Sequence, residues 1–163
     1  MKKYLFLDID GVIGSHSDYY NRPRELKDFP YSAFDPECIG RVNEILDKTG
    51  VDLVISSSWR FHPDLKEIFR KVGLPMDFLT TSKNLDIVND KRGDEIKVFL
   101  DSHPCDRYVI VDDDDFDILE EQKDNFVCVC GDEYGRPDLY KKNKGSGLTE
   151  SLKELIINML NSK

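Results

Sequence analysis

Two aspartates, Asp8 and Asp10, follow a short apolar run near the start of the chain and are separated by one residue. Four consecutive apolar residues are typical of a parallel strand that is covered on both faces, so Tyr4–Leu7 predicts a central strand. Ligands bind at the carboxyl edge of such a sheet, and residues two apart on an extended backbone point the same way. Gly11 lets the chain turn away directly afterwards. We therefore expect both carboxylates to address one ligand.

A second acidic group follows another apolar run, Tyr108–Val111, which leads into four consecutive aspartates. Carboxylates that converge repel one another, and this raises some of their pKa values unless a cation neutralises them. Mg²⁺ suits such a site because it takes one or two carboxylates and completes its octahedron with water and phosphate oxygens. Solvated surface acids are the alternative interpretation. The candidate metal ligands are the acids at these two strand ends: Asp8, Asp10, Asp112 and Asp113.

Groups that can bind phosphate occur at two further points of the chain. Ser56 and Ser57 follow a second apolar run, and Lys91 and Arg92 precede a predicted helix. Hydroxyl and backbone N–H groups at a strand end, together with a cation at a helix start, suit an anionic ligand. Serines are also common in turns and basic residues on surfaces, and which of Lys91 and Arg92 contacts phosphate stays open. Trp59 either covers the site or packs beside it.

Apolar runs alternate with amphipathic stretches along the chain, which predicts right-handed crossovers and a three-layer, doubly wound parallel α/β sheet. The common strand order 3-2-1-4-5 would make the first and fourth strands neighbours at the topological switch point. That order would bring Asp8, Asp10 and Asp112 to one crevice. Residues 14–34 have no sustained period, and we interpret them as a small flap over the strand edge in place of a full cap domain. The remaining strands are expected at 51–55, about 77–80 and 126–130.

Composition limits the classes of partner. The 163 residues predict one domain over 1–163, and the net charge of −9 disfavours strong generic binding to nucleic acid or to anionic membranes. It does not exclude a local basic pocket. No segment approaches the length of a membrane span, and the four cysteines lack the C-x-x-C spacing of a zinc or redox site. We therefore expect a cytoplasmic protein.

Four motifs occur in order: Asp8-Ile9-Asp10-Gly11, then Ser56, then a basic residue before a helix, then Val111-Asp112-Asp113. This order resembles the haloacid dehalogenase (HAD) superfamily of phosphohydrolases. More closely, three stretches are similar to the small HAD domains of "Swiss Army knife" RNA-repair proteins: Ser57-Ser58-Trp59-Arg60, Arg92-Gly93-Asp94-Glu95-Ile96 and Gly147-Leu148-Thr149.

The resemblance implies a HAD-like Rossmannoid fold and a role for each motif. Asp8 would be the nucleophile that forms an aspartyl-phosphate, and Asp10 would protonate the leaving oxygen and then activate water. Ser56, with Arg92 or Lys91, would hold the transferring phosphoryl group. Asp112 would bind Mg²⁺ directly, whereas Asp113 would bind it through water or orient the basic residue. Asp8 and the backbone carbonyl of Asp10 would complete the protein ligands.

The sequence therefore predicts a Mg²⁺-dependent phosphomonoesterase. Its substrate would be a nucleotide, a phosphorylated nucleic-acid end or a small phosphometabolite. Two alternatives come from other classes. A receiver-like signalling module also places acids at strand ends, although its phosphoacceptor follows the third strand, where this chain has no acid. A catalytically inactive phosphate-binding domain is the second, and the presence of both Asp8 and Asp10 argues against it.

Overall fold

The computed structural model describes residues 1–14, 30–82, 91–129 and 147–162. Within these ranges five parallel strands form one sheet in the order β3-β2-β1-β4-β5. The predicted parallel α/β class and the predicted strand order are both confirmed. The strands are β1 (Lys3–Leu7), β2 (Asp52–Ile55), β3 (Leu79–Thr80), β4 (Arg107–Asp112) and β5 (Phe126–Cys128).

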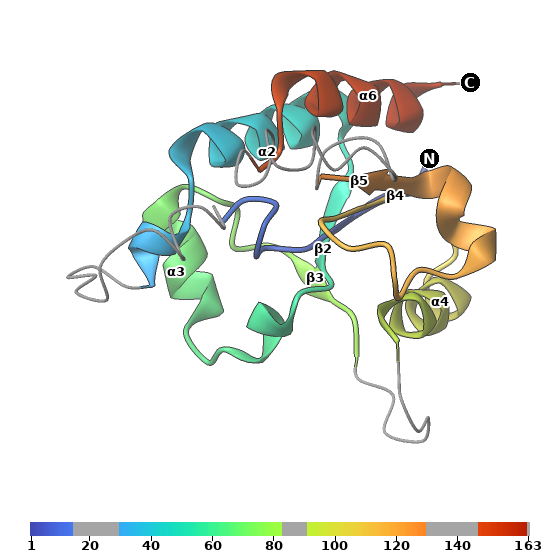
Figure 1. Ribbon diagram of the computed structural model, residues 1–163, viewed down its shortest axis with the longest axis horizontal. Coiled ribbons are helices and arrows are strands. Elements are labelled where there is room, and N and C mark those ends of the chain that lie inside the picture. Colours follow the sequence, from blue (N-terminus) through green and yellow to red (C-terminus); the bar gives the residue numbers. More distant parts are fainter. Residues whose placement is uncertain (15–29, 83–90, 130–146, 163) are drawn as a thin grey trace.

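Helices cover both faces of the sheet, as Figure 1 shows. Three pack on one face, α2 (Pro36–Thr49), α3 (Leu65–Val72) and α6 (Glu150–Asn161), and α4 (Arg92–Ser102) packs on the other. Strand β1 serves both layers because its side chains alternate. Leu5 and Leu7 join the first apolar cluster, whereas Tyr4 and Phe6 join the second beside Phe99 of α4. This two-sided burial explains why β1 is an unbroken apolar run.

The helix boundaries follow signals that are visible in the sequence. The Asp35 carboxylate accepts hydrogen bonds from two backbone N–H groups at the start of α2, and Gly50 ends that helix in the left-handed conformation with φ 62°. Gly73 ends α3 with φ 90°. The Thr149 hydroxyl caps α6. Three short 3-10 turns complete the described elements: η1 (Tyr31–Ala33), η2 (Ser58–Phe61) and η3 (Glu120–Asn125).

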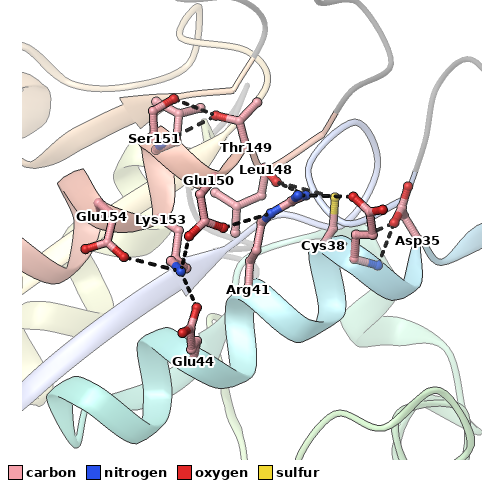
Figure 2. Close-up of polar contacts among 12 residues, drawn as sticks. Asp35, Cys38, Arg41, Glu44, Leu148, Thr149, Glu150, Ser151, Lys153 and Glu154 are labelled. Carbon is pink, nitrogen blue, oxygen red and sulfur yellow. Dashed lines mark hydrogen bonds and ion pairs between the residues drawn. The ribbon is translucent and has the colours of Figure 1, made fainter.

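Helix α6 is fixed to α2 by a buried lysine (Figure 2). The Lys153 side chain is almost fully buried, and its ammonium contacts Glu44 of α2 together with Glu150 and Glu154 of its own helix. Hydrogen bonds to Glu150 and Glu44 raise the pKa of Lys153, so the ammonium keeps its charge. Ion pairs therefore link helices α2 and α6 beside their apolar contact.

The segment before α6 contacts the loop that follows β1. The Leu148 N–H donates to the Val12 carbonyl at 2.8 Å, and the Leu148 side chain is fully buried. Gly147 has φ 58°, and a Cβ there would lie 2.7 Å from the same carbonyl oxygen. Arg41 of α2 donates to the Leu148 carbonyl at 3.1 Å (Figure 2). Contacts from residues far apart in the sequence thus stabilise the turn that follows β1.

Some element boundaries differ from the predictions. Strand β1 ends at Leu7, Asp10 forms an isolated bridge with Gly14, and the turn covers residues 11–13. Strand β3 begins at Leu79, two residues later than expected, and β5 ends at Cys128. Of the predicted flap at 14–34, residues 15–29 lie outside the described residues. Its two ends meet, because Gly14 and Phe34 form an isolated antiparallel bridge. No helix in the described ranges is long and apolar enough to span a bilayer.

Candidate active site

A crevice of about 240 Å³ opens where the carboxyl ends of β1 and β4 meet. The Asp8 N–H donates to the Val111 carbonyl at 3.0 Å, which continues the ladder past the end of β1 and fixes Asp8 at the crevice floor. The sheet therefore brings together two acidic segments that lie about a hundred residues apart in the sequence. Most of the lining is charged: Asp8, Asp10, Ser58, Arg92, Asp112, Asp113, Asp114, Asp117 and Ile118.

Three of these aspartates could share one metal ion. Asp8, Asp112 and Asp113 each offer a carboxylate oxygen, and these oxygens all lie within 4.8 Å of one another. Asp8 and Asp112 are buried and Asp113 is half-buried. Hard oxygen donors at such spacing fit Mg²⁺. The carboxylate of Asp10 does not belong to this group.

The loop before the cluster leaves room for Asp113 only because it carries a glycine. Gly11 has φ 76°, which side chains rarely adopt. A Cβ at Gly11 would lie 2.2 Å from Asp113 Oδ2, so any larger residue would displace that carboxylate. On the other side, Asp112 Oδ1 accepts a hydrogen bond from the Asp114 N–H at 3.0 Å, which shapes the turn after β4. Local backbone structure thus sets the position of two of the three acids.

Some neighbours of Asp8 raise the pKa of its carboxyl group and others lower it. Burial is the main reason that the pKa of Asp8 is raised to about 6, and the charge of Asp113 adds to the rise, whereas the Arg92 guanidinium and a hydrogen bond from Ser57 oppose it. Arg92 Nη1 lies 3.3 Å from Asp8 Oδ1 and also contacts Asp112 Oδ2. At neutral pH the carboxylate is therefore mostly ionised, and Arg92 balances part of the charge in the crevice.

The two basic candidates lie in different places relative to the crevice. Arg92 is the first residue of α4 and lines the crevice, whereas Lys91 precedes the helix and is exposed, with its ammonium 5.9 Å from the centre of the Phe116 ring. Gly93 fixes this arrangement: its N–H donates to the Asp117 carbonyl at 2.9 Å, and a Cβ there would lie 2.7 Å from that oxygen. Close packing of the helix start on the acidic loop thus turns Arg92 inward.

The serines after β2 occupy three different environments. The Ser56 hydroxyl is fully buried and has no hydrogen-bond partner within the described part of the chain. The Ser57 hydroxyl bonds to Asp8 and accepts from the Trp59 N–H at 3.4 Å. Ser58, which the sequence reasoning did not single out, lines the crevice. A buried hydroxyl without a partner is uncommon in proteins, and that of Ser56 lies directly before the serine that bonds to Asp8.

A buried ion pair anchors the serine segment, and its two partners, Arg60 and Glu95, lie in two of the stretches that carry the family resemblance, although no role was predicted for them. Arg60 Nη1 donates to the Ser56 and Ser57 carbonyls at 2.8 and 2.9 Å, and its Nη2 donates to both oxygens of Glu95 at 2.7 Å. Both side chains are more than nine-tenths buried, and Thr81 also donates to Glu95. The pair ties the serine segment to α4, which carries Arg92. A charged residue on the inner side of a short helix could not be recognised from periodicity alone.

Asp10 lies apart from the other acids and contacts Trp59. The indole Nε1–H donates to Asp10 Oδ1 and Oδ2, each at 3.0 Å. Trp59 also packs edge-on against Phe34, with ring centres 5.3 Å apart, and stacks on His62 at 6.0 Å. Trp59 thus packs against the core and contacts one crevice residue, Asp10; it is not itself among the residues that line the crevice.

Comparison with known proteins gives one family. The family model described as "HAD domain in Swiss Army Knife RNA repair proteins" matches residues 4–135, which is more than half of the chain. The match includes every residue of the crevice and excludes α6. No curated protein and no solved structure matches the chain.

Proposed function

The chain belongs to the family of HAD domains in Swiss Army Knife RNA repair proteins, and from this premise we propose that it is a Mg²⁺-dependent phosphomonoester hydrolase. Membership of the HAD superfamily supports a hydrolase-type function. The observation that carries the finer proposal is the cluster of Asp8, Asp112 and Asp113, with Arg92 against Asp8. It combines a buried nucleophile, oxygen ligands for a hard cation and a fixed positive charge.

Asp8 and Asp10 divide the chemistry between them. An oxygen of ionised Asp8 forms a bond to phosphorus, the bond from phosphorus to the leaving oxygen breaks, and Asp10 gives its proton to that oxygen. In the second step Asp10 takes a proton from water. The water oxygen then bonds to phosphorus, and the aspartyl-phosphate bond breaks. The exposed position of Asp10 suits exchange with both the leaving group and water.

Other residues would hold the phosphoryl group while these bonds change. The buried Ser56 hydroxyl is available to a phosphoryl oxygen, and Arg92 can neutralise another. Asp8, Asp112, Asp113 and the backbone carbonyl of Asp10 would hold Mg²⁺, which when bound would supply further positive charge for the phosphoryl oxygens. The six aspartates that line the crevice make such a cation necessary, because they would otherwise repel a phosphate anion.

The substrate follows from the family and from charge together. The family is named for RNA repair proteins, so a nucleotide or a phosphorylated nucleic-acid end is the substrate that we propose. The net charge of −9 limits long-range attraction of nucleic acid, so affinity would come from the phosphorylated end itself. A small phosphometabolite is the alternative, and a substrate screen with both classes separates them.

Rapid mixing of the protein with p-nitrophenyl phosphate and Mg²⁺ tests the mechanism. Asp8→Asn is expected to give no turnover and no phosphoenzyme. Asp10→Asn is expected to release one equivalent of nitrophenol and then to stall, because a good leaving group needs little protonation whereas water still needs a base. Mass spectrometry of the quenched protein should place the added phosphoryl group on Asp8. Asp64→Asn, an exposed acid outside the crevice, is the matched control and should behave as the native protein does.

Two outcomes would contradict the proposal. Mg²⁺-dependent turnover that survives in Asp8→Asn, or an adduct on another residue, would show that the nucleophile is wrong. Phosphate binding without turnover of any substrate would favour the inactive binding domain. A stable phosphoenzyme in the native protein, without hydrolysis, would favour a receiver-like module.

A further inference from the structure

Trp59 holds the carboxylate of Asp10 through a single donor. One indole N–H is shared between Oδ1 and Oδ2, each 3.0 Å from Nε1. An indole nitrogen only donates, so both carboxylate oxygens act as acceptors of the same N–H, and this fixes the plane of the carboxylate. Asp10 is otherwise on the exposed side of the crevice, where a carboxylate would rotate among several rotamers.

The indole is itself held in place, so the donor is preorganised. Its ring contacts the buried Phe34 at an interplanar angle of 70° and lies nearly parallel to His62 at 21°. The next residue, Arg60, is anchored in the interior by its ion pair with Glu95. The position of the Nε1–H therefore depends on the core and on α4, and does not depend on Asp10.

We propose that Trp59 is a positioning residue for Asp10, which keeps the carboxyl group at the crevice edge in the orientation that proton exchange requires. The inference rests on the proposed function and assigns to Trp59 a role in the same reaction. Both proton transfers need the Asp10 oxygen within hydrogen-bond reach of the leaving oxygen or of water. A carboxyl group released from the indole would spend most of its time in other rotamers, so both transfers would slow.

Trp59→Phe tests this role because it keeps the aromatic packing and removes only the N–H. With p-nitrophenyl phosphate, the first release of nitrophenol should stay within about twofold of the native rate, since that step needs little protonation. Steady-state kcat should fall roughly tenfold, as expected for loss of one hydrogen bond to a charged group, and KM should fall with it, because kcat/KM reports only the unaffected first step. In the Asp10→Asn background the same substitution should change nothing further. Asp64→Asn, an exposed acid just after the turn, is the control and should match the native protein.

Fluorescence tests the contact independently of activity, because Trp59 is the only tryptophan of the chain. Asp10→Asn should change the emission of Trp59, whereas Asp64→Asn should not. If the native protein hydrolyses no phosphomonoester, the proposed function fails, but this measurement still decides whether Trp59 and Asp10 interact. The inference is overturned if Trp59→Phe leaves the steady-state rate unchanged, if it slows the first release and the steady state equally, or if Asp10→Asn has native emission.

Discussion

Asp8 is expected to destabilise the metal-free fold at neutral pH, so Asp8→Asn should raise the free energy of unfolding although it abolishes catalysis. The side chain is only 4% exposed, and burial raises its pKa from 3.8 to about 6 despite the nearby Arg92. The ionised form is therefore less favourable in the folded protein than in the unfolded chain. Asparagine has a similar shape and no charge, so the variant lacks this penalty.

The sign and size of the effect follow from proton linkage. Between pH 3.8 and about 6 the folded protein binds more protons at Asp8 than the unfolded chain does, so stability falls as the pH rises through this window. The contribution is fully present below the unfolded pKa and is lost above the folded one. A shift of about two units at 1.36 kcal/mol each corresponds to a loss of about 3 kcal/mol by neutral pH.

This difference in the free energy of unfolding can be measured by urea unfolding of the native protein and of Asp8→Asn. Both proteins are unfolded in the presence of a chelator, at about pH 4.5 and at about pH 8. The advantage of the variant should grow by about 2 kcal/mol between the two conditions. Mg²⁺ should then stabilise the native protein more than the variant. Asp64→Asn should show no such pH-dependent difference. If Asp8→Asn is the less stable protein at the higher pH without Mg²⁺, attraction to Arg92 outweighs burial, and the reasoning is wrong.

Three further changes address other parts of the site. Gly11→Ala should weaken Mg²⁺ binding at least about tenfold by calorimetry and cost about 1–3 kcal/mol of stability, because the new Cβ meets Asp113 in a left-handed backbone conformation. Asp112→Asn should weaken Mg²⁺ binding in the same titration and Asp115→Asn should hardly change it, since only the former belongs to the cluster; equal losses would contradict this assignment. Glu95→Gln should lower the free energy of urea unfolding by about 3 kcal/mol, because it leaves a buried arginine charge without its partner, and a native value would show that the ion pair is not needed.

The sheet and its switch point were predictable from the sequence because both depend on patterns that local physics enforces. A strand covered on both faces must be apolar throughout, and right-handed crossovers allow few strand orders. Once β1 and β4 are neighbours, the polar residues at their ends must share one edge. The prediction of Asp8 and Asp112 at the same crevice needed no knowledge of side-chain contacts.

Which of Lys91 and Arg92 lines the crevice could not be predicted in this way. Adjacent residues at a helix start point in directions about 100° apart, so the choice depends on how the helix is rotated. The rotation of α4 is set by the contact between Gly93 and the Asp117 carbonyl, a tertiary contact between segments that the sequence does not connect. The start of β3 and the end of β5 were also not predicted, because the length of an edge strand depends on its pairing with the neighbouring strand, which is again a tertiary contact.

The crevice contains more negative charge than the stability of the fold requires, and this excess is an argument about function. Six aspartates line it, and within that lining Arg92 is the only positive residue of the described chain. Asp8 is buried there at a cost to stability, although an uncharged residue of the same shape would fit. Charged groups held in unfavourable surroundings are characteristic of sites that gain their favourable partner on binding. Asp8, whose burial weakens the metal-free protein, is also one of the three carboxylates whose oxygens lie close enough to share one cation. The stability measurement with and without Mg²⁺ therefore tests the site as directly as a kinetic assay does.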